Sequence, residues 1–103
     1  MSIEWAKKFK TYHIDNPQIY KAFESIALQV ASTGRSKFAV RNIFAKMRWD
    51  MAISGNDEYK INENYSAYYG RLFEEKNPKY AGFFRKKNIL PDDFSLLSYV
   101  GEA

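Results

Sequence analysis

The sequence predicts a mainly helical domain of the α+β class, with a three-helix core and short β segments. Its 103 residues suit one domain, because two cores would each lie near the lower limit for independent folding. Apolar residues make up 46% of the chain, which is typical of a globular protein and too many for a disordered one. Three stretches space these residues at helical intervals, and shorter apolar runs around them favour extended structure.

The first predicted helix covers residues 17–32. Asp15 or Asn16 can accept hydrogen bonds from the first-turn amides, and Pro17 has the backbone angle of a first helical residue. One apolar stripe then runs along the helix at Ile19, Phe23, Ile26, Ala27 and Val30. Residues 1–14 form an arm before the core, in which residues 3–12 are either a short helix or an extended cover.

The second predicted helix covers residues 39–52, with Trp49 at its flank. Its apolar stripe consists of Val40, Ile43, Phe44, Met47 and Met51. Residues 35–39, which precede it, are either a brief strand or the start of the helix itself.

The third predicted helix covers residues 62–76, with Asn62 as its cap. Residues 59–61 before it are β-like, and residues 82–87 after it are a strand or an extended arm. The core is expected within about residues 17–87. The tail, residues 88–103, is apolar enough to pack back onto the body or onto another subunit, which makes a homodimer one of two expected arrangements.

This order of elements resembles a winged helix-turn-helix domain over about residues 17–87. The resemblance implies that the second and third helices form the helix-turn-helix unit and that the third is the recognition helix. It also implies that residues 82–87 form the wing or one strand of it. The loop at about residues 52–61 departs from the pattern, because it is much longer than the usual three- or four-residue turn.

Several short strings in the chain also form a recognisable series. They are Asn16-Pro17, Lys46-Met47-Arg48-Trp49, Tyr59-Lys60-Ile61-Asn62, Tyr68-Tyr69-Gly70-Arg71-Leu72-Phe73 and Gly82-Phe83-Phe84. The series is similar to that of small uncharacterised proteins encoded in bacteriophages and bacterial chromosomes. The resemblance implies a phage or prophage accessory protein and carries over no site residues, since that family has no established activity.

The chain lacks the residue patterns of common enzymes. Without cysteine it has no thiol nucleophile, zinc-thiolate site or iron–sulfur cluster. His13 is the single histidine, is expected to be solvated or to cap a helix, and has no nucleophile elbow to act on. The neighbouring carboxylates Glu74 and Glu75 point roughly 100° apart on a helix, so they do not converge on one site. We therefore expect no enzyme, no metal and no cofactor.

The chain also lacks the signals of membrane insertion and export. No apolar run approaches the roughly 20 residues that cross a bilayer, and the first ten residues carry lysines without an apolar stretch after them. These observations predict a cytoplasmic protein without membrane contact.

The charge distribution favours a nucleic-acid partner, with DNA as the expected one. The chain carries a net charge of +4, and residues 35–61 hold six Lys or Arg against three Asp or Glu. On the third helix, asparagine can pair with adenine and arginine with guanine. The predicted contacts are Asn62, Asn64 and Arg71 to bases, and Arg35, Lys37, Arg41, Lys46, Arg48, Lys60, Arg85, Lys86 and Lys87 to phosphates. The leading hypothesis is a small non-catalytic nucleic-acid-binding protein.

The same residues have plainer interpretations. Asn62 can serve only as a cap, and residues 85–87 can guard a strand edge against aggregation. The tyrosines of the third helix could stack on single-stranded bases, but their helical spacing favours core packing.

The alternative hypothesis is a protein-binding module, such as a phage-encoded inhibitor or adaptor of a host protein. Its aromatic and methionine residues would then dominate the contact. Trp49 beside Arg48 is either an interface anchor or a buried residue.

Overall fold

The computed structural model describes residues 3–35, 37–55, 61–84, 90–91 and 93–101, and within these the fold is all-α. These residues form five α-helices and two one-turn 3-10 helices. The elements are α1 (Ile3–Asp15), α2 (Pro17–Ala31), α3 (Val40–Ser54), η1 (Glu63–Tyr65), α4 (Ser66–Lys76), η2 (Pro78–Tyr80) and α5 (Leu96–Val100).

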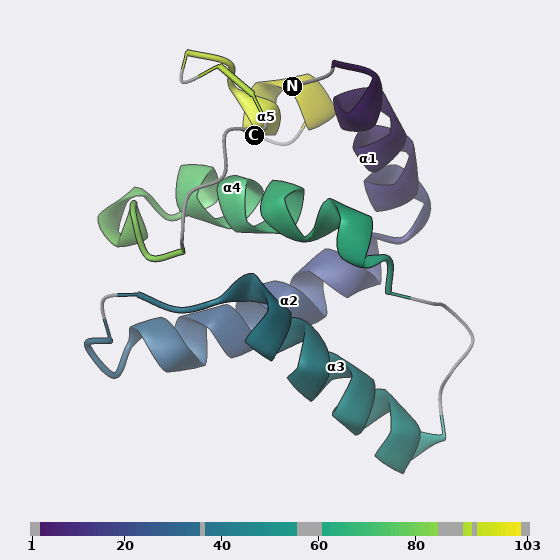
Figure 1. The fold of residues 1–103 in the computed structure, drawn as a ribbon, viewed down its shortest axis with the longest axis vertical. Helices are drawn as coiled ribbons and strands as arrows, with labels where there is room; N and C mark the ends of the chain where they lie inside the picture. Colours follow the sequence, from purple (N-terminus) through teal and green to yellow (C-terminus); the bar gives the residue numbers. More distant parts are fainter. Residues whose placement is uncertain (1–2, 36, 56–60, 85–89, 92, 102–103) are drawn as a thin grey trace.

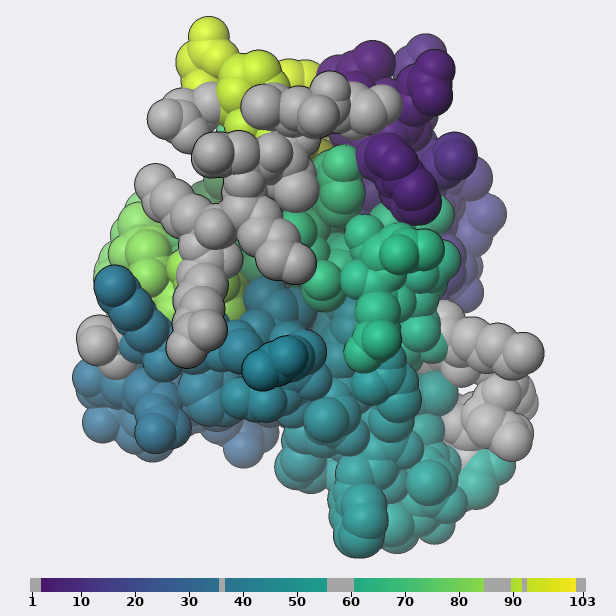
Figure 2. Space-filling model, in the orientation of Figure 1, coloured from purple at the N-terminus to yellow at the C-terminus, as the bar shows by residue number. Residues whose placement is uncertain are grey.

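Helix α4 lies at the centre of the arrangement. In Figure 1, α1 and α5 lie above it and α2 and α3 below it, with α3 crossing in front of α2. Helix α4 packs directly against α5, α3 and α2, and α1 packs against α2 and α5. The C-terminal half of α3 extends away from the other helices and forms the lower edge of the molecule (Figure 2).

The predicted helices are present, with small shifts at their ends. Residues 3–12, for which a short helix was one expectation, belong to the 13-residue helix α1. Asn16 occupies the N-cap position of α2 but makes no capping bond with its side chain; its amide instead donates to the carbonyl of Tyr12 at 3.0 Å. Asn62 does cap the third predicted helix, since its side-chain oxygen accepts from the Asn64 N–H, but that helix begins as η1 before continuing as α4.

The predicted β segments and the wing are wrong for the residues that the structure describes. These contain one isolated parallel bridge, between Phe38 and Phe84, and no strand. The Glu74 carboxylate accepts hydrogen bonds from the N–H groups of Gly82 and Phe84, both at 2.9 Å, so these groups are not available to a strand ladder. The rest of the expected wing, residues 85–87, lies outside the described residues, as do residues 59 and 60.

The core is built largely from aromatic rings. Phe23 of α2 is fully buried. Its ring contacts the rings of Phe44 on α3, Tyr69 and Phe73 on α4, and Phe84, which belongs to the β-bridge with Phe38 and marks what we call the bridge segment. The core extends to both ends of the chain, since Phe9 of α1 and Leu96 of α5 are also fully buried. The described part of the tail therefore packs back onto the body, which is one of the two expected arrangements.

His13 is buried in this core, contrary to the expectation that it is solvated or caps a helix. Its ring stacks on Phe9 at a centroid distance of 5.6 Å and meets Tyr20 edge-on. The reason is its place in α1: His13 lies four residues after Phe9, on the helix face that packs into the core.

Tyr69 carries a buried hydroxyl group with no hydrogen-bond partner among the described residues. Burying a polar group without a partner opposes folding. We therefore expect Tyr69→Phe to raise the free energy of unfolding by about 1 kcal/mol, measured by urea denaturation. Tyr20→Phe is the matched control, because the Tyr20 hydroxyl donates to Glu24 at 2.9 Å and its removal should lower stability. A loss of stability in Tyr69→Phe would contradict the prediction.

The Tyr69 hydroxyl should make the folded state less stable at alkaline pH. Burial, with smaller effects from Tyr12 and Tyr65, raises the pKa of Tyr69 far above its ordinary value. The folded state therefore retains a proton that the unfolded chain releases above about pH 10, so stability falls as the pH rises past that point. Denaturation at two pH values should show this fall, and Tyr69→Phe should show a smaller one.

Candidate nucleic-acid interface

The structure separates the predicted site residues into three groups. Arg35, Lys37 and Arg41 lie around the beginning of α3. Lys46 and Arg48 lie further along the same helix, and Asn62, Asn64 and Arg71 lie on η1 and α4 or next to them. Lys60, Arg85, Lys86 and Lys87 lie outside the described residues.

The first group, which we call the basic start of α3, consists of Arg35, Lys37 and Arg41. All three are exposed, and none forms an ion pair with a described residue. The Arg35 guanidinium lies over the ring of Phe38, 5.6 Å from its centroid, which holds it near the helix.

The helix start itself favours anions. Ala39 occupies the N-cap position and supplies no side-chain hydrogen bond, and the first turn of α3 contains no acidic residue. First-turn N–H groups and the helix dipole present partial positive charge at such an end. Three cations beside an uncapped helix start form a setting that attracts phosphate.

The second group is partly neutralised by neighbouring carboxylates. Lys46 pairs with Asp50 one turn later, and Arg48 pairs with Glu63 across the space between α3 and η1 at 2.7 Å. Arg41 and Arg48 share one flank of α3, being seven residues apart, whereas Lys46 is turned away from them by roughly 140°. The predicted phosphate contacts on α3 are therefore divided between two sides of the helix.

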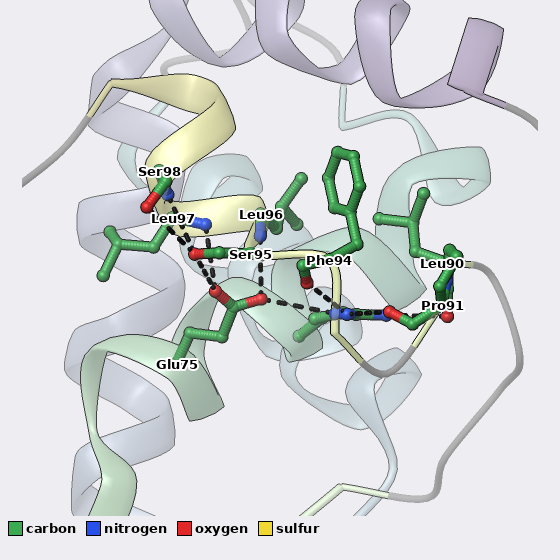
Figure 3. Close-up of polar contacts among 9 residues, drawn as sticks. Glu75, Leu90, Pro91, Phe94, Ser95, Leu96, Leu97 and Ser98 are labelled. Carbon is green, nitrogen blue, oxygen red and sulfur yellow. Dashed lines mark hydrogen bonds and ion pairs between the residues drawn. The ribbon is translucent and has the colours of Figure 1, made fainter.

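Arg71 is half-buried, and its guanidinium binds the C-terminal segment. It pairs with Glu75 at 3.3 Å and donates to the backbone carbonyls of Leu90, Pro91 and Phe94 (Figure 3). Its side chain is only 19% exposed. Since these acceptors occupy the guanidinium, we leave Arg71 out of the proposed interface.

Glu75 completes this arrangement, and the sequence analysis missed its role. Its carboxylate accepts hydrogen bonds from the N–H groups of Leu96 and Leu97 and from the Ser95 hydroxyl (Figure 3). Together Arg71 and Glu75, which we call the α4 clamp, hold the C-terminal segment on α4. The neighbouring Glu74 binds the turn at 82–84, so the two carboxylates do point to different places, as their spacing predicts.

The asparagines next to α4 have limited freedom to read bases. The side-chain oxygen of Asn62 is occupied by the Asn64 N–H at 2.9 Å. Asn64 is exposed, and its backbone N–H makes that bond.

Trp49 is exposed, which excludes the interpretation that it is buried, and its role as an interface anchor stays a prediction. Its side chain is 67% exposed, and Ile53 one turn later is 70% exposed. The sequence analysis did not single out Ile53, although its position four residues after Trp49 and off the apolar stripe is a usable signal.

No protein-family model, curated protein or solved structure matches this chain. Among the described residues, no helix has both the length and the apolar character needed to cross a membrane. The same part of the chain contains no group of three or more side chains that could hold a metal ion.

Proposed function

We propose that this chain is a small non-catalytic nucleic-acid-binding protein that grips the phosphate backbone with the basic start of α3. The observation that carries the proposal is the gathering of Arg35, Lys37 and Arg41, all exposed, at an uncapped helix start without an acidic residue. Cations and first-turn amides are the groups that proteins use to hold phosphates.

This mode of binding depends on charge and hardly on base sequence. Arg71 is occupied by the C-terminal segment, and Lys46 and Arg48 are paired. With about three phosphates contacted, the logarithm of affinity should fall with the logarithm of salt concentration with a slope of about −3. Duplexes of different sequence should bind with similar affinity.

The test is a fluorescence anisotropy titration of labelled duplex and single-stranded DNA at two salt concentrations. The double variant Lys37→Glu/Arg41→Glu should weaken binding at least tenfold, an effect of about 1.4 kcal/mol or more. A glutamate in the first turn of α3 favours the helix dipole, so the variant should remain folded.

The matched control is Lys7→Glu/Lys21→Glu, which makes the same change in net charge at exposed positions of α1 and α2. Its affinity should fall less than that of the first variant. Equal losses in both variants would mean that only net charge matters, and no binding of the natural chain at low salt would overturn the proposal.

A further inference from the structure

Arg35 lies at the outer end of a series of stacked planar side chains next to the start of α3. Its guanidinium lies over the ring of Phe38, 5.6 Å from the centroid. The Phe38 ring stacks in turn on the ring of Phe83, with the centroids 6.1 Å apart and the planes at 17° to each other. Phe83 is buried, Phe38 is half-buried and Arg35 is exposed, so the series leads from the core to the surface. We call Arg35, Phe38 and Phe83 the surface stack.

Backbone contacts hold the two rings of the surface stack in place. The N–H of Phe38 donates to the carbonyl of Phe83 at 2.9 Å, next to the bridge between Phe38 and Phe84. The turn that carries Phe83 is bound to α4, because the Glu74 carboxylate accepts from the N–H groups of Gly82 and Phe84. The ring beneath Arg35 is therefore fixed before any ligand arrives, which lowers the entropy that binding costs.

The Arg35 guanidinium is available to a ligand. It has no hydrogen bond or ion pair with any residue that the structure describes, in contrast to Arg71, whose guanidinium binds the C-terminal segment. Its N–H donors and its outer planar face are therefore open to solvent. A guanidinium can stack on a flat ring and pair with a phosphate, whereas an ammonium group offers only its charge and its donors.

We propose that the surface stack accepts an unpaired base, so that the nucleic acid held at the basic start of α3 is single-stranded; this inference rests on the proposed function. An unpaired base is a flat ring that extends the stack on the outer side of Arg35. Proteins hold single strands in this way, with bases stacked on aromatic rings and on arginine planes. In a duplex each base is already paired and stacked on its neighbours, and taking it out costs energy.

The other two cations of the basic start of α3 supply the phosphate contacts. Lys37 directly precedes Phe38 in the chain, and Arg41 follows it by three residues in the first turn of α3. Both are exposed. A strand carries a phosphate on each side of every base, so the stacked base brings two phosphates close to these cations.

The rest of α3 is poorly suited to the groove of a duplex. Beyond the first turn its cations are balanced, since Lys46 pairs with Asp50 and Arg48 pairs with Glu63. Trp49, 67% exposed, adds an apolar side chain to the same part of the helix. A helix that enters a groove needs polar and cationic groups along the inserted face. The charge distribution on α3 therefore favours a short contact with one strand.

The test compares two ligands of equal charge by fluorescence anisotropy. One is a single strand of about ten thymidines, within the usual site size, and the other is the same strand with abasic sites in place of its bases. The chain should bind the intact strand at least about fivefold more tightly, the lower end of the range for one stacked base. For about three phosphates of a single strand, the salt slope should be about −2. A uridine strand of the same length distinguishes RNA from DNA as the source of the bases.

Two substitutions test the members of the surface stack. Arg35→Lys keeps the charge but removes the planar group, so the affinity ratio of intact to abasic strand should fall below about twofold. Arg41→Lys is the matched control, since it makes the same exchange at a residue expected to contact phosphate alone, and should keep the ratio of the natural chain. Phe38→Leu removes the ring beneath Arg35 and should also lower the ratio. Because the ratio compares two ligands on one variant, a loss of stability in that variant cancels.

The outcomes separate this inference from the proposed function. If no strand and no duplex binds at low salt, both are overturned. If nucleic acid binds but the abasic strand binds as tightly as the intact ones, or a duplex with the same number of phosphates binds more tightly than either, the inference about the single strand is wrong and the phosphate contact remains. An unchanged ratio in Arg35→Lys or in Phe38→Leu would also overturn the surface stack as the place where the base lies.

Discussion

Replacing Phe23 with alanine is expected to lower the free energy of unfolding by about 3–5 kcal/mol. Phe23 is fully buried on α2, and its ring touches rings from α3, α4 and the bridge segment. The truncation removes the apolar surface that joins these elements and leaves a cavity that rigid neighbouring rings fill poorly. Since small domains are stable by only about 5–15 kcal/mol, the loss is a large share of the total.

Urea denaturation followed by circular dichroism measures this effect. Leu28→Ala is the control on the same helix, because Leu28 is 37% exposed and lies off the core-facing stripe. If the control destabilises as much as Phe23→Ala, the loss does not come from the aromatic contacts of Phe23. Helix propensity is not the cause of either loss, because alanine is the stronger helix former. If Phe23→Ala does not unfold the chain completely, its loss of stability can be read directly from the midpoint and slope.

The helices could be predicted from the sequence because their core contacts recur at short intervals. Ile19, Phe23 and Ala27 follow at four-residue steps and are all fully buried on α2. Helix propensity and the apolar stripe agree there, so local information was sufficient.

The apolar pattern of the sequence could not show that Phe83-Phe84 forms no wing strand. Phe83-Phe84 has the composition of a strand, but the backbone near it is held by Glu74, eight and ten residues from its partners Gly82 and Phe84. A carboxylate that binds two backbone N–H groups leaves no mark in the hydrophobic pattern. His13 is a different case, because its place four residues after Phe9 already puts it on the core-facing side of α1. The rings that cover it, Tyr20 of α2 and Tyr69 of α4, come from distant parts of the chain.

The candidate interface was predictable where it depends on local charge. Arg35, Lys37 and Arg41 lie within seven residues, and the structure keeps all three exposed. The sequence could not show which other cations are neutralised. Arg48 meets Glu63 fifteen residues away, and Arg71 binds carbonyls 19 to 23 residues away, which any residue type can supply.

Arg71→Met is expected to lower the free energy of unfolding by about 2–4 kcal/mol, although the variant keeps the length of the side chain. Three backbone carbonyls of the C-terminal segment lose their donor, and Glu75 loses its cation. The contacts are mostly shielded from water, with side-chain exposures of 19% and 23%, so solvent replaces them only in part. The loss should therefore exceed that of an exposed ion pair.

Two measurements separate this clamp from a surface contact. Lys46→Met breaks the exposed pair with Asp50 and should cost less than about 1 kcal/mol. Amide hydrogen exchange at Leu96 and Leu97 should accelerate in Arg71→Met, because Glu75 binds both N–H groups and loses its orienting partner. If Arg71→Met instead leaves stability and exchange unchanged but weakens DNA binding, the guanidinium belongs to the interface and the α4 clamp does not hold the C-terminal segment.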